Sequence, residues 1–380
     1  MHGNLKQREK FSSILTDFEK ARMLPSEAYI DPSWYEVEKG AIFEGAWVVV
    51  GRAEQVPNKG DFFTLNLVGQ CVLIVRDGKG AINAFSPSCR HRGALIAEGE
   101  GNKSVLVCPY HRWTYALDGK LIGAPGMDTN PNFDKENFPL VAMGCAVWGG
   151  FIFVNLNGEA PPLDDMLSDL EPIVRPYNLK NMRLARQKRY TIKANWKSYI
   201  DNSIEAYHVA SVHSKSLQPV APMSAWHTEP RENFFLQWAE FPGTLGVLQG
   251  ETGFDPMEGF DLEKPARHLL TTLLPNTVLT MTVDAIWWIT LLPLDVNTST
   301  LVVNHAFPEG TEKHPDFDAI AERYFRRFDI VSQEDIEITE IQQRGITHGR
   351  RIPGLYQEQE RLVHAFSHYV LNRVGDLVDF

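Results

Sequence analysis

The chain has 380 residues, of which 43% are hydrophobic and 22% are charged, and it carries a formal net charge of −11. This length and composition are those of a globular protein with room for two domains. The negative charge argues against a nucleic-acid-binding surface, and no stretch reaches the roughly 18 consecutive apolar residues of a membrane span. The first ten residues are polar and lack the apolar core of a secretory signal, so we expect a cytoplasmic protein.

The first 44 residues contain a helical pattern that is interrupted by Pro25 and Pro32 and then continues as an amphipathic run. From residue 45 to residue 157 the pattern changes to short β-branched and aromatic runs, such as WVVVGR and CVLIVRD. Segments containing Gly, Pro, Asn and Asp separate these runs and are typical of turns. We therefore expect an N-terminal extension over 1–44 and a small all-β domain over 45–157.

Two Cys/His pairs lie within this β domain. Cys89 and His91 form the first pair, and Cys108 and His111 form the second after sixteen further residues. Zinc fingers usually place their cysteines together and their histidines together, whereas each pair here is mixed. Mixed pairs suit a [2Fe-2S] centre of the Rieske kind, in which one iron binds two thiolates and the other binds two imidazoles. A structural zinc site is the alternative.

The residues around these ligands, CRHRGA and CPYHRWTY, resemble the cluster loops of the Rieske non-haem iron oxygenases, which read Cys-x-His-Arg-Gly and Cys-x-x-His-x-Trp-x-Tyr. The resemblance implies that the chain is the terminal oxygenase (alpha) component of a system in the ring-hydroxylating dioxygenase family. It also implies a Rieske domain with its metal loops at one tip, and an extension over 1–44 that packs on the catalytic domain.

Residues 158–380 begin with a linker-like Gly-Glu-Ala-Pro-Pro segment and then alternate between helical and strand patterns. Helices are expected near 163–176, 196–210 and 315–343, and strands near 183–194, 233–241, 268–274, 277–293 and 299–307. The resemblance implies a helix-grip-like catalytic domain with an antiparallel sheet and helices, and thus an α+β protein. The Gly- and Pro-rich stretch 242–265 is expected to be a mobile loop over a site or a disordered surface insertion.

A second group of candidate ligands lies in NWKSYIDNSIEAYHVASVHS, residues 195–214. His208 and His213 are five residues apart, about 140° around an ideal helix, so both reach one ion only where the helix ends or distorts. The segment resembles the family's Asn-x-x-(Glu/Asp)-x-Tyr-His-x4-His. With a carboxylate from elsewhere, the two histidines would form the facial triad of Fe(II) oxygenases. Two structural histidines are the alternative.

The missing carboxylate is expected in FDIVSQEDIEITEIQQRG, which offers several acidic residues. The resemblance selects Asp335, because the family pattern places an aspartate about seven residues before a glutamine, and here Gln342 follows at that distance. The neighbouring Glu334 is the rival ligand. A solvated acidic helix face is the third interpretation.

Glu205 lies three residues before His208. The resemblance implies that this carboxylate bridges a cluster histidine of one subunit and an iron ligand of its neighbour, so that it carries the electron path in a homotrimer. Most ring-hydroxylating dioxygenases have aspartate at this position. A glutamate here resembles the branch of the family that acts on quaternary ammonium compounds. A surface carboxylate is the alternative.

The chain contains no GxGxxG after a strand, no flavin signature and no plant-type ferredoxin cysteine set. Its electrons are therefore expected from a separate NAD(P)H reductase, with or without a ferredoxin, and a small β subunit stays an open question. The expected activity is O2-dependent hydroxylation, or dealkylation through hydroxylation, of an aromatic or an N-alkyl or quaternary ammonium compound. The alternatives are a Rieske electron-transfer protein without oxygenase activity and a zinc hydrolase that uses the same triad.

Several aromatic residues in the second domain are candidates for either a substrate pocket or the core. They are Trp226, Phe234, Phe235, Trp238, Phe241, Trp287 and Trp288. A cage of such residues would bind a methylammonium group, and the same residues would stack on a planar ring.

Overall fold

The structure is a computed structural model that describes residues 11–375, 377 and 378. The chain divides into two compact units, of which the smaller is Phe43–Met166. The larger unit contains the chain up to Ile42 together with the chain from Leu167 onward. The first ten residues, on which the expectation about a secretory signal depends, lie outside the described residues.

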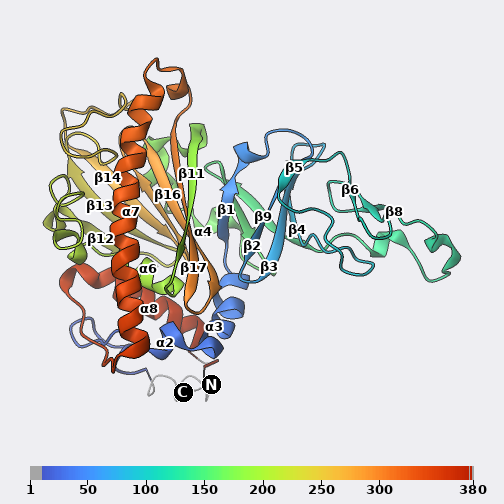
Figure 1. Ribbon diagram of the computed structural model, residues 1–380, viewed down its shortest axis with the longest axis horizontal. Coiled ribbons are helices and arrows are strands. Elements are labelled where there is room, and N and C mark those ends of the chain that lie inside the picture. The colour runs from blue at the N-terminus through green and yellow to red at the C-terminus, as the bar shows by residue number, and fades with distance from the viewer. Residues whose placement is uncertain (1–10, 376, 379–380) are drawn as a thin grey trace. The chain divides into compact units, whose positions relative to one another are not determined.

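The smaller unit is built from two antiparallel sheets (Figure 1). The seven-stranded sheet has the order β1-β10-β9-β4-β3-β2-β5, and the three-stranded sheet has the order β6-β7-β8. The strands are β1 (Val48–Arg52), β2 (Asp61–Leu67), β3 (Gln70–Arg76), β4 (Ile82–Phe85), β5 (Glu100–Asn102), β6 (Leu106–Val107), β7 (Thr114–Tyr115), β8 (Leu121–Gly123), β9 (Ala142–Trp148) and β10 (Phe151–Asn155). A short helix, α4 (Leu163–Met166), ends the unit.

Two tight turns set the pairing of these strands. Val68 and Gly69 join β2 to β3 and have φ angles of +47° and +88°, as the two-residue turns of twisted hairpins require. The turn over residues 117–120 joins β7 to β8, and Gly119 has a φ of +84°. A Cβ atom on Gly119 would lie 2.6 Å from a ring carbon of Phe85, so this position needs glycine for space as well as for conformation.

The larger unit is organised around one seven-stranded antiparallel sheet with the order β11-β17-β16-β15-β14-β13-β12. Its strands are β11 (Met182–Ile192), β12 (His227–Pro230), β13 (Phe234–Phe241), β14 (Ala266–Leu273), β15 (Thr277–Met281), β16 (Ile286–Asp295) and β17 (Thr298–Pro308). Every residue of the central strand β15 is buried, so this sheet is covered on both faces at its centre.

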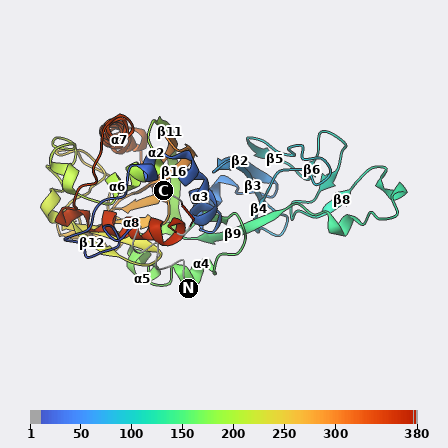
Figure 2. The ribbon, with the colours of Figure 1, turned by 90° about the horizontal axis from the view of Figure 1, so that it is seen from below.

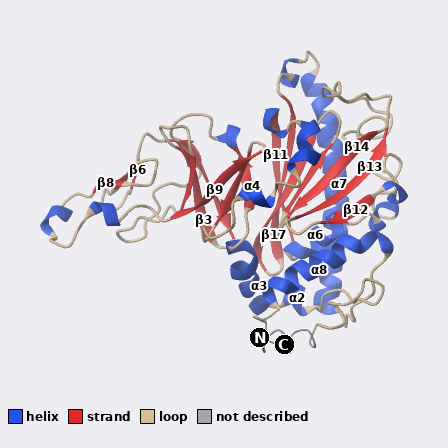
Figure 3. Cartoon of the chain, turned by 180° about the vertical axis from the view of Figure 1, so that it is seen from behind, coloured by secondary structure: helices blue, strands red, loops and turns tan. Residues whose placement is uncertain are grey.

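The helices of this unit are α2 (Glu27–Ile30), α3 (Pro32–Glu38), α5 (Glu171–Val174), α6 (Trp196–Ser203), α7 (Phe317–His348) and α8 (Arg361–Val374). The long helix α7 lies across one face of the sheet, and Figure 2 shows it end-on at that side. Helices α2, α3 and α8 gather at one end of the sheet (Figure 3). None of the described helices is long and apolar enough to cross a membrane.

Helix α7 turns one consistent face toward the protein. Tyr324, Phe328, Val331 and Asp335 follow one another at intervals of three or four residues, and all are buried. With 32 residues the helix is about 48 Å long, so one rigid element can position groups that lie far apart on its buried face. Three of these four buried positions contribute to the site described below.

The α+β fold predicted from the sequence is confirmed, but some predicted elements differ. The strand expected over 277–293 is wrong as a single strand, because β15 and β16 are separated by a turn. That turn carries Asp284, which is buried and accepts hydrogen bonds from Thr244 Oγ1 at 2.7 Å and from Tyr324 Oη at 2.5 Å. Because partners that are distant in the sequence stabilise this turn, it contains no glycine or proline from which the turn could have been predicted. The helix expected over 163–176 is split into α4 and α5.

The stretch 242–265 connects β13 to β14 without a helix or strand. Its Val247 and Phe254 are buried in a cluster with Phe307 and Tyr324, and the Phe254 N–H donates to Tyr324 Oη at 2.7 Å. The interpretation of this stretch as a disordered surface insertion is therefore wrong. Apolar residues anchor it against α7.

Candidate metal centres

Two short loops carry the Cys/His pairs, and their backbones follow the same path. In the first loop the N–H of Gly93 donates to the carbonyl of Cys89 at 2.8 Å. In the second the N–H of Arg112 donates to the carbonyl of Cys108 at 3.2 Å. Both donors lie four residues after their cysteine and both are left-handed, with φ angles of +75° and +61°. The two loops thus form the same kind of turn, as expected for a cluster that is held by two equivalent loops.

These turns bring the four side chains together in like pairs. Cys89 and Cys108 are 3% and 1% exposed and lie side by side in the core. The ring centres of His91 and His111 are 4.6 Å apart, and the His91 ring stacks on Trp113 at 5.0 Å. The Nδ1 atom of His111 is buried without a hydrogen-bond partner among the described residues. This arrangement fits a [2Fe-2S] cluster with a buried thiolate end and an imidazole end nearer the surface.

Hydrogen-bond donors surround the thiolate end. The Tyr115 Oη lies 3.3 Å from Cys89 Sγ, and it accepts a hydrogen bond from the Arg90 N–H at 3.0 Å. Burial acts to raise the pKa of the Cys108 thiol, but the backbone N–H groups of its own loop favour the thiolate more strongly, and the net pKa is lowered. A lowered pKa suits a cysteine that binds metal as a thiolate.

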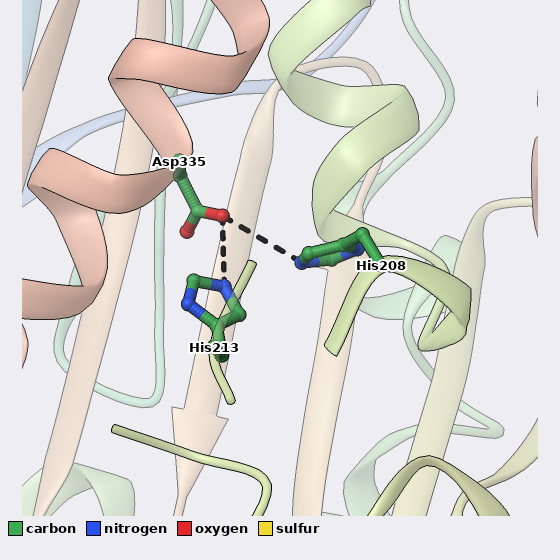
Figure 4. A group of neighbouring side chains, drawn as sticks. All are labelled: His208, His213 and Asp335. Atoms are coloured by element: carbon green, nitrogen blue, oxygen red, sulfur yellow. Dashed lines mark ion pairs between the residues drawn. The ribbon is translucent and has the colours of Figure 1, made fainter. Parts of the chain in front are cut away.

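A second centre lies in the larger unit. Among the described residues, His208, His213 and Asp335 form the group whose donor atoms converge on one point, all within 4.8 Å of one another (Figure 4). Asp335 Oδ1 lies 2.9 Å from Nε2 of His213 and 3.6 Å from Nε2 of His208. The cysteines and histidines of the two loops are not such a group among the described residues, as expected for ligands that divide between two irons.

The local structure explains how two histidines five residues apart reach one point. Helix α6 is capped at its N-terminus by Asn195, whose side chain accepts a hydrogen bond from the Lys197 N–H, and it ends at Ser203. His208 lies in the 3-10 turn Tyr207–Ala210 that follows, and His213 lies beyond that turn. The helix expected near 196–210 is thus shorter than predicted, and it ends before both histidines, which meets the condition that the helix ends or distorts there.

A different carboxylate contacts the Nδ1 atom of each of the two histidines. Nδ1 of His208 lies 2.5 Å from Glu205 Oε1, and Nδ1 of His213 lies 2.8 Å from Glu334 Oε2. A carboxylate at Nδ1 keeps the proton there and leaves Nε2 free to bind a metal. Glu334 also accepts a hydrogen bond from Ser216 Oγ at 2.5 Å. The interpretation of Glu334 as the third iron ligand is therefore wrong, because this side chain orients His213 instead.

The electrostatics of this centre favour a divalent cation. Burial acts to raise the pKa of Asp335, but His213, His208 and the Asn202 amide stabilise the carboxylate more, and its pKa is lowered. Burial acts to lower the pKa of His213, but Asp335 and Glu334 outweigh it, and the pKa is raised. Two imidazole nitrogens and one carboxylate oxygen are the donor set of non-haem Fe(II) oxygenases. The residues present therefore fit a mononuclear iron.

A pocket lies beside the three metal ligands and is lined in part by them. Its floor is a row of side chains on neighbouring strands, because Gln237 pairs with Leu270, Leu270 with Thr280, and Thr280 with Trp287. Residues paired in this way project from the same face of a sheet. Helix α7 forms another wall of the pocket and contributes Arg327, Phe328, Val331 and Asp335.

The aromatic residues predicted for either pocket or core divide between these roles. Trp226 and Trp287 line the pocket. The others are not among its lining residues: Phe234, Phe235, Trp238, Phe241 and Trp288.

Arg327 and Gln237 line the pocket but are not among the residues predicted from the sequence. For Arg327 a sequence signal exists, because Arg327, Val331 and Asp335 are spaced four residues apart and share the buried face of α7. An arginine on the same face as a metal ligand marks a pocket more strongly than an arginine on a solvated face. For Gln237 the strand pattern gives no such signal.

Two family models match the chain. The ring hydroxylating alpha subunit (catalytic domain) model matches residues 179–376, and the Rieske [2Fe-2S] domain model matches residues 46–136. The first model contains the three converging residues of the larger unit, and the second contains both Cys/His loops.

The chain is 27% identical to the glycine betaine monooxygenase oxygenase subunit of Pseudomonas aeruginosa (strain UCBPP-PA14), over 97% of this chain and 94% of that protein. It is 29% identical to the chloroplastic choline monooxygenase of Arabidopsis thaliana, over 93% of this chain and 85% of that protein. A crystal structure of a quaternary ammonium Rieske monooxygenase with L-carnitine matches with a TM-score of 0.77 and 26% identity, over 93% of this chain and 96% of that one.

Proposed function

Since this chain belongs to the ring-hydroxylating alpha-subunit family of Rieske non-haem iron oxygenases, we propose that it hydroxylates a carbon atom bound to the nitrogen of a quaternary ammonium compound. The chain is the terminal oxygenase of such a system, with a Rieske [2Fe-2S] domain and a His-His-Asp mononuclear iron site. The observation that carries the proposal is the near full-length similarity to relatives named for quaternary ammonium substrates. That similarity favours this class over the aromatic compounds that the sequence leaves open.

The residue assignment follows from the two centres. We assign the cluster to Cys89, His91, Cys108 and His111, and the iron to His208, His213 and Asp335. The pairing of like ligands in the first centre and the convergence of donor atoms in the second support this assignment. We place the cluster domain at 45–157 and the iron domain at 158–380, with 1–44 as an extension of the iron domain.

The surrounding residues prepare the iron site for its task. Iron bound there would supply the O2 chemistry that inserts one oxygen atom into a C–H bond, since a facial triad leaves coordination positions open. Glu205 and Glu334 keep the two imidazoles in the tautomer that presents Nε2. Val331 and Trp287 supply apolar surface beside the ligands, which limits access of bulk water to the reacting carbon.

The proposed reaction consumes one O2, one NAD(P)H and one proton, and it releases one water. One oxygen atom enters the C–H bond next to the nitrogen and the other leaves as water. The resulting carbinol on a quaternary nitrogen then breaks its C–N bond: the nitrogen keeps the electron pair, the hydroxyl proton is lost, and a tertiary amine and an aldehyde are formed. Oxygenation would therefore be read out as dealkylation.

An oxygenase subunit of this kind takes its electrons from a separate reductase. We propose further that this reductase uses NAD(P)H, with or without a ferredoxin, and that the oxygenase is a homotrimer. In that assembly Glu205 would link a cluster histidine of one subunit to His208 of its neighbour. The 2.5 Å contact between Glu205 and His208 Nδ1 supports this role, because one half of such a link is already formed within the chain. A head-to-tail contact that serves every subunit must close into a ring.

The test is a screen for substrate-dependent O2 uptake by the purified protein with a surrogate reductase. Quaternary ammonium compounds, tertiary amines and aromatic acids would be compared. We expect uptake with one or more quaternary ammonium compounds, together with equimolar aldehyde and tertiary amine. Uptake confined to aromatic compounds, with a hydroxylated ring as the product, would refute the proposed substrate class.

A further inference from the structure

The guanidinium group of Arg327 is the feature of the pocket that the metal chemistry does not use. Arg327 is 3% exposed, lines the pocket, and makes no hydrogen bond or ion pair with any described residue. Its guanidinium carbon lies 5.4 Å from the ring centre of Trp287 and 5.9 Å from that of Phe328. A guanidinium has five N–H donors in a rigid fork, and burying them without acceptors costs free energy.

Neighbouring arginines on helix α7 behave differently. Arg326 is half exposed and pairs with Glu251, and the Arg323 side chain donates to the carbonyl of Thr252 at 2.6 Å. These two cations face solvent and have protein acceptors. Of the three, Arg327 is the one that lines the pocket, and its guanidinium lies over the aromatic rings of Trp287 and Phe328.

Arg327 stays charged at neutral pH. Burial lowers its pKa to about 10, while the carboxylates of Asp335 and Glu334 act in the opposite direction. Both carboxylates already serve the metal centre, Asp335 as a ligand and Glu334 as the partner of His213. The positive charge in the pocket therefore has no acceptor of its own.

We propose that Arg327 binds a carboxylate group of the substrate, so that the quaternary ammonium compound is a zwitterion. The inference rests on the proposed function and names its substrate class more closely. The planar fork of a guanidinium matches the two oxygens of a carboxylate, and such bidentate pairs are both strong and selective. A quaternary ammonium compound without an acidic group would bring a second cation next to the first, which is unfavourable where protein partly excludes water.

The position of Arg327 orients the substrate. Arg327 and Asp335 are eight residues apart on one helix, so their Cα atoms are separated by about 12 Å along its axis. Arg327 thus enters the pocket from a backbone position about two helical turns from Asp335, whereas Glu205 and Asp335 line the pocket at the metal site. A zwitterion would place its carboxylate at Arg327 and its N-alkyl group toward the iron. Trp226 adds an aromatic surface for the cationic end.

The test uses matched pairs of probes with the purified holoenzyme. Trimethylammonium carboxylates of increasing chain length are compared with their primary amides, which keep the shape and the ammonium but lose the negative charge. Benzoate and benzamide form a second pair. Binding is followed by calorimetry and by the fluorescence change of the pocket tryptophans, neither of which requires turnover. We expect at least one acid to bind wild-type protein about 10-fold or more tightly than its amide.

Substitution of the arginine assigns this preference to one residue. In Arg327→Gln the affinity for the acid is expected to fall about 100-fold while the affinity for the amide stays within twofold, because only the acid loses a charged partner. Arg326→Gln is the matched control, since it removes an exposed arginine one position earlier and should change neither affinity. Arg327→Lys keeps the charge without the fork and should give an intermediate loss for the acid.

The outcomes separate this inference from the proposed function. An acid that binds no more tightly than its amide to wild-type protein at every chain length overturns the carboxylate site, even where Arg327→Gln fails to fold. Equal losses for acid and amide in a folded Arg327→Gln also overturn it, because they indicate a structural role. Turnover of quaternary ammonium compounds without any preference for acids would support the proposed function and refute the carboxylate site. Arg327-dependent binding of benzoate, with oxygenation of aromatic acids only, would support the carboxylate site and refute the proposed function.

Discussion

The carboxylate of Glu334 provides the sharpest test of how the iron site is built. Its Oε2 accepts hydrogen bonds from His213 Nδ1 at 2.8 Å and from Ser216 Oγ at 2.5 Å, so one oxygen fixes both the direction and the tautomer of a metal ligand. Glu334→Gln keeps the volume and removes the charge. Hydrogen bonds to an ionised acceptor are roughly twice as strong as neutral ones, and loss of such an outer partner typically lowers metal affinity by about 10- to 100-fold.

That loss corresponds to about 1.4–2.7 kcal/mol of iron-binding free energy. It can be measured by equilibrating the protein with chelators of graded strength and determining iron per chain, while visible absorbance reports the cluster separately. Glu337→Gln is the matched control, because this exposed residue of the same helix accepts a hydrogen bond from Gln333 Nε2 at 3.3 Å and contacts neither histidine in the described part of the chain. A Glu334→Gln protein that retains iron within twofold of wild type would show that Glu334 does not orient His213.

Three further outcomes are expected. His213→Ala should lose the mononuclear iron and all oxygenation but keep the red-brown cluster spectrum, since the two centres use separate ligands; product formation by this variant would exclude the triad. Glu205→Gln should keep both metals and the oligomer yet lose nearly all turnover, and near-normal turnover or an active monomer in native mass spectrometry would remove the cross-subunit path. Burial raises the pKa of Asp284 to about 6, so its protonated form favours folding at low pH and this contribution fades as pH rises through about 6. The Tm of Asp284→Asn minus that of wild type should therefore increase between pH 4 and pH 6, and a constant difference would contradict the shift.

The cluster could be predicted because its information is local. All four proposed ligands lie between Cys89 and His111, and the mixing of cysteine and histidine within each pair favours two thiolates on one iron and two imidazoles on the other. The structure adds what the spacing does not contain. It shows that Gly93 and Arg112 repeat one turn, and that burial places the cysteine pair inside and the histidine pair nearer the surface.

The iron site was predictable only in part, because its third ligand comes from a distant helix. The sequence offered Glu334 and Asp335 as neighbours, and adjacent helical residues differ by about 100° in direction. Which of them faces the histidines depends on how α7 rotates against the sheet, a tertiary property that propensities do not contain. Family resemblance selected Asp335, whereas the second function of Glu334, the contact with His213 Nδ1, became visible only in the folded chain.

Helix α7 contributes residues both to the metal site and to the proposed substrate-binding site. Asp335 reaches the metal, Glu334 orients a metal ligand, and Arg327 enters the pocket two turns earlier. A continuous helix holds its Cα atoms at fixed axial distances, so the backbone positions of Arg327 and Asp335 do not adjust to substrates of different length. Sites on rigid elements position their groups more closely than sites on loops. If a carboxylate binds at Arg327, the number of bonds between that carboxylate and the oxidised N-alkyl carbon must fit the distance between Arg327 and the iron site. The length of the substrate chain, rather than its ammonium group, then determines which zwitterion is oxidised.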